Sequence, residues 1–216
     1  MGLWLVVMLG AGLLMSTWQT VAAAGVQRQG DVRAGQAKSE AERCQECHGV
    51  DGQGAGRSNG PEGKFAKLAG QYPEYILKQI RDFRSGARKH DLMAIMAGSV
   101  DDDDVLDIAA YFAAQAPMKG EPARPSATGR KLYQEGDAGR GIAACASCHG
   151  AEGRGLRANG FISPAIGGQE WLYLDKQLRE WRSGDRRNSS GGVMNLVTQG
   201  LTDEDIVALA DYISAL

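Results

Sequence analysis

Two hexapeptides, "CQECHG" at residues 44–49 and "CASCHG" at residues 145–150, dominate the chemistry of this chain. They contain all four cysteines and two of the three histidines among the 216 residues. In each, two thiols stand three residues apart and an imidazole directly follows the second thiol. The repetition of this spacing indicates the same chemistry at two places in the chain.

The sequences around the hexapeptides repeat as well. An offset of 101 residues pairs Cys44 with Cys145, and it also pairs Tyr111 with Tyr212. "YILKQIRDFRSGAR" then matches "YLDKQLREWRSGDR" at an offset of 98, because the loops before and after this segment differ in length. Self-similarity over this length indicates a tandem duplication of one structural unit.

We therefore expect two domains, at residues 25–118 and 126–216, joined by a linker at residues 119–125. The stretch "APMKGEPARPSATG" (residues 116–129) holds three of the six prolines and has no hydrophobic period. Such composition is typical of an extended connection between domains.

Each copy predicts a small all-α unit. A short helix precedes the first cysteine, and apolar residues recur at helical spacing in two later segments of each copy. Gly86 and Gly184 are placed to end one of these helices, and Thr202 with Asp205 resembles a capping box. No strand is predicted. The apolar positions are Ile76, Ile80 and Phe83 with Leu174, Leu178 and Trp181, and Val105, Ile108, Ala109 and Phe112 with Ile206, Leu209, Ala210 and Ile213.

Residues 1–24 predict a signal peptide. The apolar run "LWLVVMLGAGLL" is followed by small residues, and Ala22 and Ala24 suit cleavage before Gly25. The basic residues that usually precede such a run are missing, so an uncleaved anchor stays open as the alternative. The run is short for a membrane span, which needs about 20 residues. We expect export to the periplasm and cleavage near Ala24.

The overall composition is that of a globular protein with a small core. The formal net charge is −2, which gives no general attraction to nucleic acid. Aromatic residues make up only 6%, which is little for two separate cores. We therefore expect a large apolar group to contribute to each core.

Four kinds of site compete for the hexapeptides. A shared Cys₄ zinc site usually draws its ligands from a few tens of residues, and here each pair has its own domain. A thioredoxin-like dithiol belongs in a βαβ unit, and a disulfide across three residues closes too small a loop to stabilise much. C-x-x-C-H is the attachment signature of c-type haem. It predicts two covalent haems, held by Cys44 and Cys47 with His48, and by Cys145 and Cys148 with His149.

A methionine in each copy is the candidate second axial ligand. Met93 and Met194 each lie 45 residues after the histidine of their hexapeptide. Methionine is usually a core residue, but a thioether is also a recognised haem ligand. Met96 is a rival in the first copy, although Val197 occupies its equivalent position. His90 is a conceivable ligand too, and we expect it to be a partly exposed loop residue.

The chain resembles the cytochrome c4 family of diheme bacterial cytochromes. The resemblance rests on the two hexapeptides, on "KLAGQYPEYILKQIRDFRSGARK" and "SPAIGGQEWLYLDKQLREWRSGDRR", and on the methionine followed by an acidic helix start. It implies two class I cytochrome c domains in a pseudo-twofold arrangement, each with histidine and methionine on its iron. The family usually has proline ahead of "KLAGQ", where its carbonyl supports the histidine. Pro164 fills that place in the second copy, and Ala66 in the first.

The resemblance implies a monomeric electron carrier rather than an enzyme. Its partners would be a cytochrome bc complex or a dehydrogenase as donor and a terminal oxidase or reductase as acceptor, with loose association at the membrane surface. The alternative is a sulfide or thiosulfate dehydrogenase, or the cytochrome subunit of one. That alternative, like a gas sensor, requires an open iron position. A methionine in both copies favours the carrier.

Overall fold

The computed structural model describes residues 1–2, 29–54, 65–120, 122, 126–158 and 160–216. Apart from its first two residues, the predicted signal peptide lies outside the described residues. Within those residues, no helix combines the length and the apolar character needed to cross a lipid bilayer.

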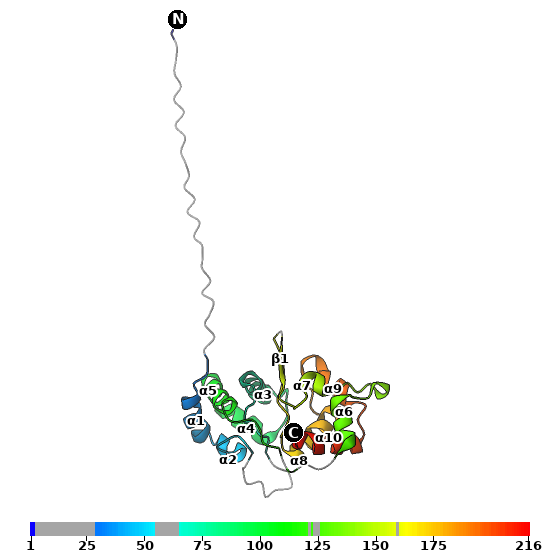
Figure 1. Cartoon of the computed structure of the whole chain (residues 1–216). Helices are drawn as coiled ribbons and strands as arrows, with labels where there is room; N and C mark the ends of the chain where they lie inside the picture. Colours follow the sequence, from blue (N-terminus) through cyan, green and yellow to red (C-terminus); the bar gives the residue numbers. More distant parts are fainter. Residues whose placement is uncertain (3–28, 55–64, 121, 123–125, 159) are drawn as a thin grey trace.

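The chain forms two groups of helices with the same order of elements (Figure 1). The first group consists of α1 (Val32–Ala41), α2 (Cys44–His48), α3 (Pro73–Ser85), α4 (Asp91–Ser99) and α5 (Asp102–Ala113). The second consists of α6 (Ala127–Gln134), α7 (Ala146–His149), α8 (Trp171–Ser183), α9 (Val193–Thr198) and α10 (Asp203–Ser214). Two 3₁₀ turns, η1 (Ala138–Arg140) and η2 (Ser190–Gly192), and the strands β1 (Leu156–Ala158) and β2 (Phe161–Ser163) belong to the second group.

In each domain the first and last helices cross in direct backbone contact. A Cβ atom added to Gly35 of α1 would lie 1.9 Å from the Asp107 carbonyl oxygen of α5. A Cβ added to Gly129 of α6 would lie 1.9 Å from the Ala208 carbonyl oxygen of α10. Only glycine permits this approach, so the same crossing is built into both copies.

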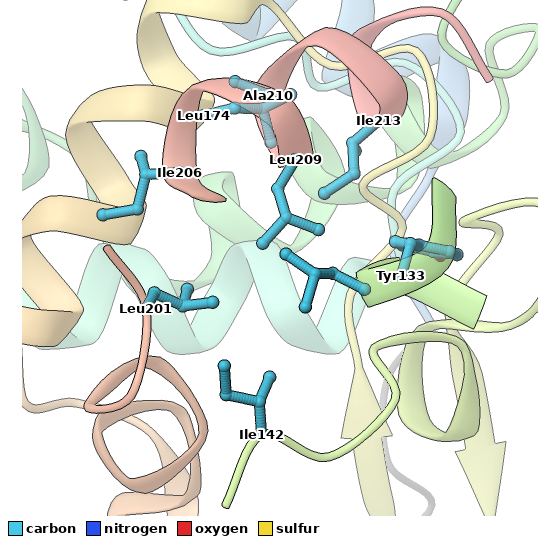
Figure 2. Close-up of a cluster of buried hydrophobic side chains, with 9 residues drawn as sticks. Tyr133, Ile142, Leu174, Leu201, Ile206, Leu209, Ala210 and Ile213 are labelled. Atoms are coloured by element: carbon cyan, nitrogen blue, oxygen red, sulfur yellow. The ribbon is translucent and has the colours of Figure 1, made fainter. Parts of the chain in front are cut away.

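The predicted apolar faces form the core of each domain. In the second domain, Ile206, Leu209 and Ile213 of α10 pack with Leu174 of α8 and Tyr133 of α6, as Figure 2 shows. In the first domain the corresponding cluster is built from Ile76, Ile108, Ala109, Tyr111 and Phe112.

The predicted helix ends are also confirmed. Gly86 and Gly184 end α3 and α8 in the left-handed conformation, with φ of 75° and 82°. Thr202 and Asp205 form the capping box at the start of α10.

The expectation of no strand was wrong. β1 and β2 form an antiparallel hairpin, with Ala158 opposite Phe161 and Leu156 opposite Ser163. The sequence signal was Asn159-Gly160 between apolar residues, which is a strong hairpin dipeptide. The hairpin was not predicted because the sequence around this dipeptide is rich in glycine. Arg157 of β1 reaches the first domain, where it pairs with Glu74 of α3 at 2.6 Å.

The two domains also meet through a cluster of buried polar side chains. Arg88 donates to the amide oxygens of Gln79 and Gln177, each at 2.8 Å. Arg186 donates to the same two oxygens, at 3.1 Å and 2.6 Å. Gln79 and Gln177 occupy equivalent positions on α3 and α8, so this contact follows the pseudo-twofold relation between the domains. Arg186 is itself buried.

Candidate haem-binding sites

Each C-x-x-C-H motif forms one short helix that ends at its histidine. His48 is the last residue of α2, and His149 is the last residue of α7. Gly49 and Gly150 follow with φ of 81° and 78°, a conformation that glycine adopts without strain. The turn therefore places the two thiols and the imidazole of each copy on one short, sharply terminated element.

Both histidines are fixed by a hydrogen bond to a backbone carbonyl. His48 Nδ1 lies 2.8 Å from the Ala66 oxygen, and His149 Nδ1 lies 2.9 Å from the Pro164 oxygen. A carbonyl can only accept, so Nδ1 carries the proton and Nε2 presents its lone pair. No described residue bonds to either Nε2. Burial lowers the pKa of both imidazoles, which favours the neutral form that binds a metal.

The departure from the family pattern at Ala66 therefore leaves the contact intact. Its carbonyl accepts the histidine bond at nearly the same distance as the carbonyl of Pro164. Proline fixes its own φ and alanine does not, so the first domain must hold this carbonyl by other contacts.

The thiol chemistry fits haem attachment better than the alternatives. All four cysteines are free thiols. Burial raises the pKa of Cys44 and of Cys145 to about 11, the opposite of what a reactive dithiol requires. In the described part of the chain, no three Cys, His, Asp or Glu side chains gather as metal ligands, so the two cysteine pairs do not converge on one zinc site.

The candidate methionines lie in two short helices that the sequence does not predict. Met93 belongs to α4 and Met194 to α9, and both are half-buried. In each copy a side chain upstream accepts the methionine N–H: His90 Nδ1 at 3.3 Å and Ser189 Oγ at 3.2 Å. His90 is thus the N-cap of α4, a role that its isolated position in the sequence did not indicate. Met96 lies one turn further along α4 and is also half-buried.

The acidic starts of α5 and α10 are held by equivalent arginines. Arg84 bonds to Asp102 and to the Ala97 carbonyl, and Arg182 bonds to Asp203 and to the Leu201 carbonyl at 3.0 Å. Arg84 thereby ties α4 to the start of α5, whereas Arg182 holds the loop before α10 to the start of that helix. The acidic residues at both helix N-termini are also stabilised by the helix dipole.

Taken together, each domain presents two thiols, a neutral imidazole with a free Nε2, and a methionine 45 residues further along the chain. This donor set fits a covalently attached haem and defines a tandem haem protein.

Comparison with known proteins agrees with this class. The family model for cytochrome c matches residues 32–115 and again residues 126–216. Cytochrome c4 of Pseudomonas aeruginosa is 38% identical over 208 residues, which covers 94% of this chain and 98% of the relative. The crystal structure of reduced recombinant cytochrome c4 from Pseudomonas stutzeri superposes with a TM-score of 0.76 at 39% identity, and covers 87% of this chain and 99% of that one. A thiosulfate dehydrogenase electron acceptor of Stutzerimonas stutzeri is 33% identical, covering 94% of this chain and 91% of the relative.

The chain belongs to the cytochrome c family and, within it, to the diheme cytochromes c4. It is an electron-transfer cytochrome with two covalently bound haem c groups, one for each domain.

Two contacts near the histidines were missed from the sequence. Gln71 and Gln169, the last residues of "LAGQ" and "IGGQ", each bond to the backbone of the opposite domain. The repetition of this tetrapeptide was the only signal, and its partners lie about a hundred residues away along the chain.

Proposed function

We propose that the chain is a periplasmic electron carrier in which each domain holds its haem by the residues predicted from the sequence. The thiols of Cys44 and Cys47, and of Cys145 and Cys148, form the thioether links. His48 and Met93 would be the iron ligands of the first domain, and His149 and Met194 those of the second. The observation that carries this proposal is the histidine–carbonyl bond, which presents Nε2 beside two thiols in both copies.

The bound haem supplies a one-electron couple between Fe(II) and Fe(III). The protein residues set the conditions for that couple. A neutral thioether is a soft ligand that favours Fe(II) and raises the potential. With a histidine and a methionine both committed to each iron, no position would remain for a substrate, so the proposed role is transfer and not catalysis.

The proposed domain limits are residues 25–118 and 126–216, after removal of a signal peptide at residues 1–24. Export would place the protein where a cytochrome bc complex or a dehydrogenase can reduce it and a terminal oxidase or reductase can oxidise it. The protein would act as a monomer, with loose association at the membrane surface.

A second candidate is a role in the oxidation of sulfur compounds. A relative at 33% identity is named as a thiosulfate dehydrogenase electron acceptor. This name supports a thiosulfate-oxidising enzyme as the donor. The stronger version, in which the chain is itself a sulfide or thiosulfate dehydrogenase or its cytochrome subunit, requires an iron with an open position.

Measurements on the purified holoprotein distinguish the electron carrier from the enzyme. Intact mass and acid–acetone extraction should show two haems that stay on the polypeptide. The reduced protein should bind carbon monoxide slowly at neutral pH, and it should not be reduced at a catalytic rate by thiosulfate or sulfide alone. Rapid carbon monoxide binding at either haem, or turnover with either compound, would overturn the carrier role in favour of an enzyme.

A further inference from the structure

Two glutamines cross the domain interface in opposite directions. Gln71 precedes α3 of the first domain and Gln169 precedes α8 of the second, and each is only 4% exposed. Buried amides need partners, and here the partners lie in the other domain. Gln71 contacts Ala165, and Gln169 contacts Lys67.

Each glutamine makes a pair of bonds with one residue. Gln169 Oε1 accepts the Lys67 N–H at 2.7 Å, and its Nε2 donates to the Lys67 carbonyl at 3.0 Å. Gln71 Oε1 accepts the Ala165 N–H at 3.1 Å, and its Nε2 donates to the Ala165 carbonyl at 2.9 Å. The amide orientation is fixed, because each Oε1 also accepts the N–H of the next residue in its own chain segment, at 2.9 Å for Glu170 and 3.1 Å for Tyr72.

The glutamines and the histidines bond to the same two peptide groups. In each group the N–H donates to a glutamine and the carbonyl accepts from a histidine. The Lys67 N–H belongs to the same amide as the Ala66 carbonyl, which accepts the His48 Nδ1–H. The Ala165 N–H belongs to the same amide as the Pro164 carbonyl, which accepts from His149. A continuous hydrogen-bonded chain therefore runs from each imidazole, through one amide, to a glutamine of the opposite domain.

Hydrogen bonds in such a chain strengthen one another. An acceptor on the N–H side polarises the amide and makes its carbonyl oxygen a better acceptor. A better acceptor for Nδ1–H makes the imidazole more basic at Nε2, and a more basic ligand stabilises Fe(III). We propose that Gln169 tunes the haem iron of the first domain and that Gln71 tunes the haem iron of the second. Both are positioning residues that act through a histidine.

The two glutamines differ in the length of the hydrogen bond that each accepts from the opposite domain. Gln169 lies closer to its N–H than Gln71 does, at 2.7 Å against 3.1 Å. Pro164 also restrains its own carbonyl, whereas Ala66 has no such restraint. The first domain should therefore depend more strongly on its glutamine.

The test uses the full-length holoprotein with Gln169→Met or Gln71→Met, which keep the side-chain length and remove the hydrogen bonds of the amide to the opposite domain and to the next residue. The inference rests on the proposed ligation by His48 and His149, so two quantities are measured for each domain. One is the Nδ1–H resonance of the histidine in ¹⁵N-labelled reduced protein. The other is the potential of each haem, followed through its assigned haem-methyl resonances during a redox titration.

Each substitution should affect the histidine and the haem of the opposite domain. Gln169→Met should shift the His48 Nδ1–H upfield, speed its exchange with solvent and raise the potential of the first-domain haem. Gln71→Met should do the same to His149 and the second-domain haem, with smaller shifts. Glu74→Gln is the matched control, since it removes the ion pair to Arg157 across the same interface and touches neither amide. It should leave both histidines unchanged.

Three outcomes would overturn the inference. They are shifts in the domain that carries the substitution, equal shifts at both haems, and no shift in a folded variant that keeps the interface. If the spectra of the unsubstituted protein show that His48 or His149 is not an iron ligand, the proposed ligation is contradicted instead. Failure of the inference and failure of the proposed function are therefore distinguishable.

Discussion

Lys38 Nζ donates to the Asp107 carboxylate at 2.7 Å, and Asp107 is completely buried between α1 and α5. The same carboxylate accepts the Asp31 N–H at 2.8 Å, so it joins the start and middle of the first helix to the last helix. The second domain has Ala208 at the equivalent position, so α6 and α10 cross in the same way without a charged side chain at this position. The two copies thus keep one geometry and stabilise it differently.

Replacing Asp107 by alanine should destabilise the first domain. The substitution removes the acceptor of the Asp31 N–H and one of the two carboxylates that pair with Lys38. Leaving a hydrogen-bond donor without its partner costs about 1–3 kcal/mol. Asp107→Asn should cost less, because the amide oxygen can still accept the N–H. Denaturant unfolding of the holoprotein, followed at each haem, measures the effect. Equal stability of Asp107→Ala and the unsubstituted protein would contradict the assigned role.

Alanine at either helix crossing should disturb packing. Gly35→Ala and Gly129→Ala each place a methyl group against a backbone carbonyl, and such overpacking costs about 1–3 kcal/mol. Gly98→Ala is the matched control, because this residue of α4 has open space around it and an ordinary φ. The control should be neutral or stabilising by up to about 1 kcal/mol. Similar loss of thermal stability in all three variants would show that the crossings are not tight.

The start of α10 should make the second domain sensitive to acid. Burial alone would raise the pKa of Asp205, but the hydrogen bonds from Arg140 and from the Thr202 N–H hold it below its ordinary value of 3.8. A carboxyl with a lowered pKa stabilises the folded state above about pH 4, and this contribution disappears as the pH falls through the folded pKa.

Asp205→Asn should therefore weaken the loss of second-domain stability as the pH falls below about 4. At neutral pH it should lower the stability, because it removes the ion pair with Arg140, although the amide oxygen can still accept the Thr202 N–H. Unfolding midpoints measured against pH check both statements. An unchanged slope below pH 4 would assign the acid sensitivity to other carboxyls.

Met93 and Met96 can be told apart by substitution. Met93→Ala should remove a soft neutral ligand from the first iron, so that a harder ligand takes its place and the potential of that haem falls. The far-red band from methionine on Fe(III) should drop to about half, because only one of two haems loses its ligand. Met96→Ala should keep the band and cost only packing energy. The reverse pattern would show that Met96 is the ligand.

Most of the fold could be predicted from local sequence patterns. The apolar faces of α3, α5, α8 and α10 and the capping box at Thr202 depend on residues within one or two turns, so the sequence predicts them directly. α4 and α9 were missed because neither has a polar face to reveal its period: Leu92, Ile95 and Leu196 are exposed. The hairpin was missed because its Asn-Gly turn lies in a glycine-rich stretch.

Contacts between the domains could not be predicted in the same way. Gln169 and Lys67 lie 102 residues apart, and nothing near either residue indicates that they meet. Their bonds exist only when both copies are folded and related by the pseudo-twofold axis. Arg186 illustrates the same limit, since its partners Gln79 and Tyr75 come from the other domain.

The crossed glutamines also have a consequence for how this gene can evolve. Each copy supplies a side chain that lies beside the histidine of the other copy, so a substitution in one half changes the surroundings of a histidine in the other half. In a single half, the amide at Lys67 or Ala165 and the glutamine of that half would turn to water instead. Substitutions at the two glutamines and at their partner residues are therefore coupled across the two halves of the gene.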